Sequence, residues 1–180
     1  QISELLENLL EWSKSQRGVI ESHPEKIDIS ALAEENVDLF RENAEKKNIA
    51  LTSEVESGIF AFADRNMIRI VIRNLVSNAI KFTNPGGEVK VSASEIENFV
   101  QISVTDTGVG IHEEDIPGLF SIDKQKTTPG TAKEKGSGLG LILCKEFVEQ
   151  NGGRIWVESE VNKGTTFKFT IPKQPAEQME

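Results

Sequence analysis

The sequence has one cysteine, two histidines and no tyrosine, and none of its apolar stretches is long. A single cysteine excludes an intrachain disulfide, and the apolar residues 141–143 beside Cys144 favour a buried thiol over a nucleophile. No apolar run approaches the roughly 20 residues of a membrane span, and no signal peptide is recognisable. The net charge of −9 argues against nonspecific binding to nucleic acids and to anionic membranes.

The remaining composition is typical of one soluble α/β domain with an appendage. With 180 residues, 37% of them hydrophobic and 27% charged, the chain can bury a sizeable core. In residues 1–22 apolar side chains recur every three or four positions, which predicts a helix that belongs to a bundle. Residues 23–28 indicate a linker because a His-Pro pair breaks this pattern, and residues 174–180 indicate a frayed tail. A chain that begins within a helical repeat is expected to be part of a longer protein.

Helical and strand-like patterns alternate between the linker and the tail. Helices are predicted from Ser30 to about Lys47, over residues 64–83, and from Gly136 to about Asn151. Strands are predicted over residues 49–56, 59–63, 89–93, 100–104, 154–160 and 165–171. Turn residues at 97–98 and 162–164 are expected to join the last four strands into two hairpins. In the first of the helices, Leu39 is among the residues assigned to the inner face.

The helix predicted over residues 64–83 carries polar residues on its apolar side. Asp64 is a suitable N-cap, and Asn74, Asn78 and Lys81 form one stripe at i, i+4, i+7 spacing. Each asparagine can be a core amide that is hydrogen-bonded to nearby backbone. Alternatively, amide oxygens ligate a hard cation such as Mg²⁺, and the ammonium group of the lysine reaches phosphate oxygens. The stripe therefore favours a nucleotide together with its metal.

Two glycine-rich segments lie where a ligand can approach the backbone. Residues 106–111, Asp-Thr-Gly-Val-Gly-Ile, place a carboxylate beside two glycines at the end of a half-buried strand. Residues 136–141, Gly-Ser-Gly-Leu-Gly-Leu, open a helix whose N-terminal amides can receive phosphate. Between them, residues 112–135 lack periodicity and are rich in lysine, which is typical of a mobile functional loop.

In their order along the chain, these motifs closely resemble the catalytic domain of sensor histidine kinases. The motifs are Asn-x-x-x-Asn-Ala-x-Lys-Phe-Thr from Asn74, Asp-x-Gly-x-Gly-Ile from Asp106, Gly-x-Gly-Leu-Gly-Leu from Gly136 and Gly-Thr-x-Phe from Gly164. The likeness covers about residues 29–172, within an implied ATP-binding domain at residues 29–173. The family shares a superfamily with gyrase, MutL and the ninety-kilodalton heat-shock chaperone. It implies a two-layer α/β sandwich, with a mixed sheet covered by helices and an ATP lid between, preceded by one long bundle helix.

The resemblance implies a base pocket built around one carboxylate. Asp106 would accept a hydrogen bond from the adenine amino group. Phe82 stands where the family commonly has tyrosine, which keeps an apolar contact and loses a hydroxyl. The other residues of the implied base pocket are Gly108, Gly110, Ile111 and Thr166.

At the phosphate end, the resemblance makes Asn78 the magnesium ligand and residues 112–135 the ATP lid, with Phe120 as the family's lid phenylalanine. The implied cofactors are therefore ATP and Mg²⁺. The remaining nucleotide contacts would come from Asn74, Lys81, Lys135, Gly136, Ser137, Gly138, Leu139 and Gly140.

Asn74 and Lys81 are the residues assigned to catalysis. The ATP-hydrolysing members of the superfamily normally have a glutamate at position 74 that activates water, whereas an amide is too weakly basic to accept the proton. We therefore expect poor hydrolysis, and a site suited to donating a phosphoryl group to a protein.

The resemblance also implies partners for this chain. Residues 1–22 match the second helix of the family's dimerisation hairpin, and the first helix, which carries the phosphorylated histidine, is absent here. His23 and His112 do not match the phosphoacceptor context and are expected to be bystanders. The expected partners are ATP, an acceptor histidine on a hairpin, a response-regulator receiver domain and a second copy of the parent protein. The domain is expected in the cytoplasm, in a parent that can be anchored in the bacterial inner membrane.

Two other functions remain open. A non-catalytic nucleotide-binding module would keep the fold without transferring phosphate, although the intact motifs argue against it. A serine kinase of the anti-sigma type shares the pocket but generally lacks an upstream helical hairpin, so residues 1–22 weigh against it.

Overall fold

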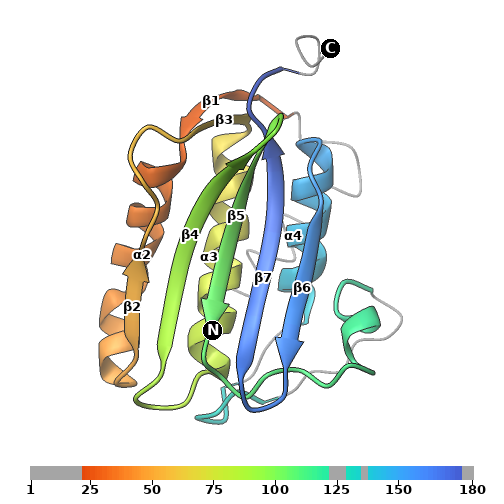
Figure 1. Cartoon of the computed structure of the whole chain (residues 1–180). Coiled ribbons are helices and arrows are strands. Elements are labelled where there is room, and N and C mark those ends of the chain that lie inside the picture. Colours follow the sequence, from red (N-terminus) through yellow and green to blue (C-terminus); the bar gives the residue numbers. More distant parts are fainter. Residues whose placement is uncertain (1–21, 122–128, 135–137, 176–180) are drawn as a thin grey trace.

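The chain folds into one layer of helices and one layer of strands. The computed structural model describes residues 22–121, 129–134 and 138–175. Its helices are α2 (Ile29–Lys46), α3 (Arg65–Phe82) and α4 (Leu139–Gln150), with a 3-10 helix, η1, at Ile116–Gly118. Its strands are β1 (Glu25–Asp28), β2 (Ala50–Ser53), β3 (Phe60–Ala63), β4 (Glu88–Ile96), β5 (Phe99–Asp106), β6 (Ile155–Glu160) and β7 (Gly164–Pro172). Figure 1 shows α2, α3 and α4 side by side on one face of the sheet, which confirms the predicted two-layer α/β sandwich.

The main sheet is mixed, and β5 is its central strand. Its order is β2-β4-β5-β7-β6, with β2 parallel to β4 and every other neighbouring pair antiparallel. The two predicted hairpins are confirmed as β4–β5 and β6–β7, while β1 and β3 form a separate two-stranded sheet. Because β5 lies between β4 and β7, the residue that ends β5 is enclosed on both sides.

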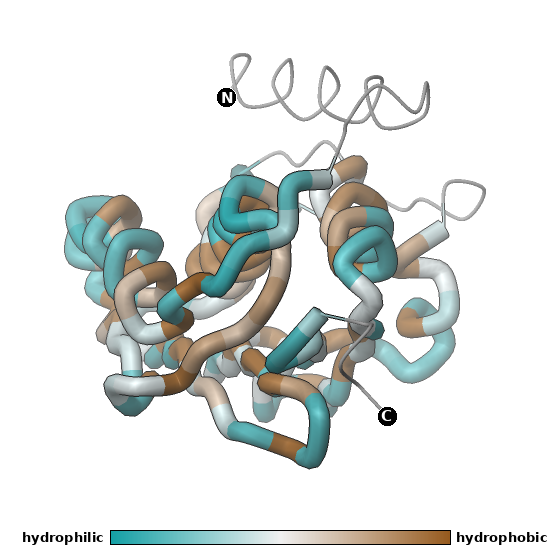
Figure 2. Tube along the Cα trace, turned by 90° about the horizontal axis from the view of Figure 1, so that it is seen from above, coloured by the Kyte–Doolittle hydropathy of each residue, from teal (hydrophilic) through white to brown (hydrophobic). Residues whose placement is uncertain are grey.

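The hydrophobic core fills the space between the layers. Ile102 of β5 and Phe169 of β7 are opposite each other in the sheet, and both are fully buried. Leu75 of α3 and Leu143 of α4 belong to the same buried cluster. Figure 2 looks down on the two layers and shows hydrophobic and hydrophilic residues alternating along the helices, as expected for helices with one covered face. None of the helices in the described ranges combines the length and the apolar character that crossing a membrane requires.

Cys144 lies inside this core, as predicted. Its side chain on α4 is fully buried, and its Sγ lies 3.8 Å from the carbonyl oxygen of Val71 on α3. Burial raises the pKa of the thiol, so the reactive thiolate is strongly disfavoured.

Residues 25–28, which are part of the segment predicted to be a linker, form strand β1. They pair antiparallel with β3, from Glu25 opposite Ala63 to Asp28 opposite Phe60. Only Ile27 of this strand is buried. A strand that buries one residue gives no alternating pattern in the sequence, so the pairing with β3 decides its structure.

The N-cap of α2 lies two residues before the predicted one, Ser30. Asp28 is the N-cap, and its side chain accepts a hydrogen bond of 3.1 Å from the N–H of Ala31. The hydroxyl of Ser30 instead donates to the carbonyl oxygen of Val55. Both residues are good caps, so the end of β1 at Asp28 determines which of them is used.

The assignment of Leu39 to the inner face of α2 is also wrong, since this side chain is 62% exposed. α2 lies at the edge of the helix layer, with α3 as its only neighbouring helix in Figure 1. An edge helix is covered over a narrow stripe. That stripe consists of Ile29, Leu32, Ala33, Asn36, Val37 and Ala44.

α3 begins and ends as predicted. Asp64 is its N-cap and accepts hydrogen bonds from the N–H groups of Asn66 and Met67 at 2.9 and 3.1 Å. The helix runs to Phe82, and the N–H of Val109 donates to the carbonyl oxygen of this residue at 3.1 Å. The C-terminal end of α3 therefore lies beside the loop that follows β5.

We expect Phe169→Ala to lower the free energy of unfolding by about 3–5 kcal/mol, because removing a fully buried ring leaves a cavity in the core. Denaturation in urea measures this difference. Phe60→Ala is the matched control, since Phe60 on β3 is 38% exposed and should cost much less. Equal losses in the two variants would contradict the position of the core.

Candidate functional site

The candidate site lies at the end of the sheet where β5 stops. Asp106, the last residue of β5, is only 5% exposed. Its Oδ1 accepts a hydrogen bond of 2.8 Å from the N–H of Gly108, and the N–H of Thr165 also donates to the carboxylate. Burial raises the pKa of Asp106 to about 6, and these two N–H groups oppose that shift only in part. The result is a buried carboxylate that can accept a further hydrogen bond from a ligand.

The loop after β5 approaches two other elements closely, and glycine is required at both places. A Cβ on Gly108 would overlap the carbonyl oxygen of Phe82 at the end of α3. Gly110 has φ of +70°, and a Cβ there would overlap the carbonyl oxygen of Glu160 in the β6–β7 turn. The loop is therefore packed between α3 and this turn, and the group that lies close to each glycine is protein backbone. The predicted approach of these glycines to a ligand stays a prediction.

Hydroxyl groups tie this loop to β6 and β7. The Oγ of Ser159 accepts a hydrogen bond from the N–H of Ile111 and donates one to the carbonyl oxygen of Gly164, both at 2.9 Å. It also lies 2.9 Å from the Oγ1 of Thr165. Because the only hydroxyl proton of Ser159 goes to a carbonyl, Thr165 must be the donor in this contact. The lone pairs of Thr165 are then left to accept from another group.

Thr165, rather than Thr166, shares a face of the sheet with Asp106. The strand register places Asp106 opposite Thr165 and Thr105 opposite Thr166. The Oγ1 atoms of Thr105 and Thr166 lie 3.1 Å apart on the other face. The structure therefore does not bring Thr166 to the predicted base pocket.

The sequence contained two signals for this register. In the motif Gly-Thr-x-Phe the threonine is residue 165, and Thr166 stands at the variable position. The buried residues that follow in β7, Phe167, Phe169 and Ile171, alternate in phase with Thr165. Ser159, in contrast, lies in no motif, and only the pairing of β6 with β7 identifies it.

α3 brings its polar stripe to the same end of the molecule. Asn74 is 6% exposed, and its Nδ2 donates to the carbonyl oxygen of Ile70 at 3.0 Å. Its Oδ1 faces Gly140, where an added Cβ would lie 3.0 Å away. The hydrogen bond to Ile70 fits the interpretation of Asn74 as a core amide bonded to nearby backbone. Its oxygen faces the glycine motif of α4, and its role toward a ligand stays a prediction.

Asn78 and Lys81 follow along α3 and are half-buried. The Nζ of Lys81 lies 4.6 Å from the centroid of the Phe82 ring, so these two predicted nucleotide contacts are adjacent. Within the described ranges, no group of three or more His, Cys, Asp or Glu side chains could hold a metal ion. The amide oxygen of Asn78 suits Mg²⁺, but a magnesium ion here would need most of its oxygen ligands from a nucleotide and from water.

The described part of the second glycine motif lies against α3. α4 begins at Leu139, with Gly138 as its N-cap in the left-handed conformation at φ 73°. Gly140 lets the first turn of α4 approach Asn74. The contacts predicted at Lys135, Gly136 and Ser137 lie outside the described residues.

The structure describes residues 112–121 and 129–134 of the loop that was predicted over residues 112–135. η1 occupies three of its residues, and the ring of Phe120 packs edge-on against Phe167 of β7, with centroids 6.3 Å apart and an interplanar angle of 89°. Leu119 and Phe120 both pack against the core. Residues 122–128 lie outside the described residues. The first part of the predicted lid is thus anchored on the sheet.

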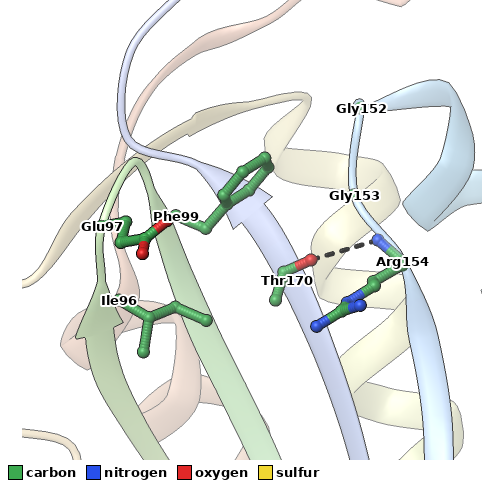
Figure 3. A pocket seen from close by; sticks show the side chains of 7 residues that line it. All are labelled: Ile96, Glu97, Phe99, Gly152, Gly153, Arg154 and Thr170. Atoms are coloured by element: carbon green, nitrogen blue, oxygen red, sulfur yellow. Dashed lines mark hydrogen bonds between the residues drawn. The ribbon is translucent and has the colours of Figure 1, made fainter. Parts of the chain in front are cut away.

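A separate pocket of about 730 Å³ lies at the opposite end of the sheet (Figure 3). It is lined by Ile96, Glu97, Phe99, Gly152, Gly153, Arg154 and Thr170. These residues include the turn where β5 begins, whereas Asp106 ends that strand. None of the residues predicted to bind a nucleotide lines this pocket, so it is distinct from the candidate site.

Comparisons with known proteins cover the part of the chain that contains these residues. The profile of a family described as "Histidine kinase-, DNA gyrase B-, and HSP90-like ATPase" matches residues 63–175, more than half of the chain. The chain belongs to this ATPase family. The matched range includes α3, the Asp106 loop and both strands of the β6–β7 hairpin.

Among these ATPases, the chain is similar to sensor histidine kinases. The adaptive-response sensory kinase SasA of Synechocystis sp. is 34% identical to it over 93% of this chain, and the chain spans 44% of that relative, somewhat less than half. The nucleotide-free catalytic domain of histidine kinase ThkA is 34% identical, with a TM-score of 0.75, over 88% of this chain and 100% of that one. This ATPase is therefore the catalytic domain of a sensor histidine kinase, as the order of its motifs predicted.

Two further solved structures show histidine kinases with ligands or partners. Full-length ShkA in complex with AMPPNP has a TM-score of 0.80 and 29% identity, over 94% of this chain and 35% of that one. ThkA in complex with the response regulator protein TrrA has a TM-score of 0.74 and 29% identity, over 98% of this chain and 50% of that one.

We expect Asp106→Asn to weaken the binding of ATP to this ATPase domain by at least about tenfold, because an NH₂ group would replace an acceptor oxygen. Calorimetric titration measures the affinity. Asp38→Asn makes the same chemical change at an exposed position of α2 and should bind ATP normally. Undiminished binding by Asp106→Asn would contradict the assigned adenine contact.

The raised pKa of Asp106 predicts opposite pH trends for stability and for binding. The folded domain holds this proton with a pKa of about 6, above the ordinary value of 3.8. The contribution of Asp106 to the free energy of unfolding should therefore rise as the pH falls through this interval. Adenosine binding should weaken below about pH 6 instead, because the protonated carboxyl loses an acceptor.

The measurements are thermal melts and adenosine titrations at several pH values, made on the wild-type domain and on Asp106→Asn. The difference between the two pH profiles gives the contribution of Asp106 separately from that of the other carboxylates. Adenosine is used because it has no phosphate that titrates in the same range. Parallel pH profiles for the wild-type domain and the variant would contradict the predicted ionisation of Asp106.

Proposed function

We propose that this domain binds Mg-ATP with Asp106 as the acceptor for adenine, and that it donates the γ-phosphate to a histidine on a dimerisation hairpin. The observation that carries the proposal is the buried amide of Asn74, which faces the glycine motif of α4. An amide at this position supports transfer to a protein over transfer to water.

Base recognition would rest on one acceptor and on the shape of the backbone. The carboxylate of Asp106 accepts from the adenine amino group, and Thr165 offers hydroxyl lone pairs on the same face of the sheet. Gly108 and Gly110 let the loop after β5 pack against Phe82 and Glu160, and this packing holds the loop beside Asp106. Phe82 and Ile111 would supply apolar contact to this ring.

Phosphate binding would rest on Lys81 and on the start of α4. The ammonium group of Lys81 balances phosphate charge, and the first N–H groups of α4 have no carbonyl partner within the helix. Magnesium, when bound, neutralises charge between the phosphates, and Asn78 is the residue that would hold it. Residues 135–137 would complete this end of the site.

Asn74 would separate transfer from hydrolysis. Its Nδ2 is already used by the carbonyl of Ile70, and its amide oxygen is too weakly basic to take a proton from water. Water then does not hydrolyse the γ-phosphate, which stays on the nucleotide until an imidazole nitrogen of the acceptor attacks the phosphorus. The bond to the bridging oxygen breaks, and ADP leaves with its electron pair.

The acceptor and the further partners would come from outside the described residues. We place the second helix of the hairpin at residues 1–22, in a homodimeric parent, with a receiver domain as the next phosphoryl acceptor. The complex of ThkA with a response regulator supports this last step by similarity. Since ATP is the phosphoryl donor, the domain would work in the cytoplasm, where ATP is available.

The direct test supplies the domain with γ-labelled ATP and a helical hairpin that carries an acceptor histidine. Label should appear on the hairpin, and a hairpin with that histidine replaced by alanine should stay unlabelled. Absence of label from both hairpins would contradict the proposed transfer.

We expect Asn74→Glu to raise ATP hydrolysis per bound nucleotide by less than the about 10²–10⁴-fold that a well-placed general base contributes. The new carboxylate can take a proton from water, but its charge also repels the triphosphate. Phosphotransfer to the hairpin should not improve. Release of inorganic phosphate at saturating Mg-ATP measures the effect, and rapid hydrolysis by the wild-type domain without an acceptor would show that the role given to Asn74 is wrong.

A further inference from the structure

Lys47 makes contacts that neither the motifs nor the proposed mechanism uses. It is the C-cap residue of α2, and its side chain is only 12% exposed. Its Nζ donates to the carbonyl oxygens of Ile80 and Lys81 at 2.8 and 2.9 Å, and to Oε1 of Glu134 at 2.7 Å. All three donors of one ammonium group are therefore used to join α2, the end of α3 and residues 129–134.

Residues 129–134 are docked on the C-terminal end of α3. Figure 1 shows this short described segment below the end of the helix. The N–H of Thr131 donates to the carbonyl oxygen of Lys81 at 3.0 Å. The hydroxyl of Thr131 lies 3.2 Å from the same oxygen and 3.0 Å from the carbonyl oxygen of Thr83, which share its proton. The segment thus caps carbonyl groups that the helix cannot satisfy by itself.

The docking is assisted by charge on both sides of Lys47. Burial of Glu134 favours its neutral form, but the pKa of this carboxyl is lowered because Lys47 and two backbone N–H groups donate to it. Glu134 is therefore ionised at neutral pH. On the other side, the C-terminal carbonyls of α3 form the negative end of the helix dipole, where a cation is favoured.

The docked segment also touches the candidate phosphate ligand. Gly130 is buried, and a Cβ there would overlap both the Cγ of Lys81 and the carboxylate of Glu134. The backbone of Gly130 therefore packs directly on the aliphatic stem of Lys81. A side chain with several rotatable bonds is restricted when its stem is packed in this way.

We propose that Lys47 is a positioning residue for the nucleotide site: by docking residues 129–134 on the end of α3, it fixes the direction from which Lys81 reaches the phosphates. The inference rests on the proposed function, since it requires phosphates at Lys81. It concerns only the phosphate end, because Asp106 and Thr165 are held by β5 and β7 without a contact to Lys47.

The test compares ATP with adenosine, which has no phosphates to meet Lys81. Lys47→Met keeps an unbranched side chain and removes the three donors. We expect its ATP affinity to fall about tenfold, the effect of one poorly aligned hydrogen bond to a charged group. Adenosine affinity should change by less than about twofold, because the base contacts are untouched. In hydrogen exchange, the N–H of Thr131 should exchange faster while β5 and β7 keep their protection.

Two further variants make the comparison specific. Thr131→Val removes the hydroxyl from the docked segment without changing α2, and it should lower ATP affinity in the same direction as Lys47→Met. Lys46→Met is the matched control, since Lys46 is the adjacent lysine, pairs with Glu42 and has a side chain that is 69% exposed. This control should bind ATP like the wild-type domain.

Wild-type ATP affinity in Lys47→Met would overturn the inference, and so would equal losses for ATP and adenosine or an unchanged exchange rate at Thr131. If Lys47→Met does not fold, Thr131→Val decides by the same criteria. A wild-type domain that binds no ATP would instead overturn the proposed function, so the two failures can be told apart.

Discussion

The site depends on the burial of the Asp106 carboxylate. Raising its pKa from 3.8 to about 6 corresponds to about 3 kcal/mol at neutral pH, which the folded domain bears in the absence of a ligand. A group that is costly to ionise where it lies gains more from an added hydrogen-bond donor than an exposed carboxylate does. The same burial that reduces stability therefore increases the energy available for binding an amino group.

This burial is possible because the surrounding backbone is placed by the sheet. β5 lies between β4 and β7, so the register of both strand pairs determines the position of Asp106 at the end of β5. Gly108 then allows the loop to turn against Phe82, and Gly110 allows it to pass Glu160. The loop can keep this position beside Asp106 only with glycine at residues 108 and 110. A Cβ at either residue would overlap a backbone carbonyl oxygen, and the loop would have to shift.

The sequence predicted those parts of the fold and site that local chemistry determines. Asp64 caps α3 as expected, and the glycines at 108 and 110 lie where backbone crowding requires them. The errors lie where pairing or an edge decides instead, as at the Asp28 cap and at Leu39, and no pattern in the sequence predicts strand β1. Thr165 was missed for another reason, since the alternation of buried residues along β7 already indicates that Thr165 faces inward, and the β5–β7 register places it opposite Asp106. The roles given to Asn78 and Lys81 remain predictions. The fold determines where these two side chains lie, but it does not determine which atoms of a nucleotide they contact.

The two ends of the site are held by different kinds of structure, and this difference bears on how such a domain can vary. The proposed adenine end is held by strand pairing and by backbone contacts, so a change there disturbs the sheet. At the phosphate end, side chains from α2, α3 and residues 129–134 meet through a few hydrogen bonds, with Lys47 at their centre. Single substitutions can therefore alter that end while the base pocket is kept. Under the proposed mechanism, one α/β sandwich can retain its nucleotide while the residue at position 74 determines whether water or a protein receives the phosphate.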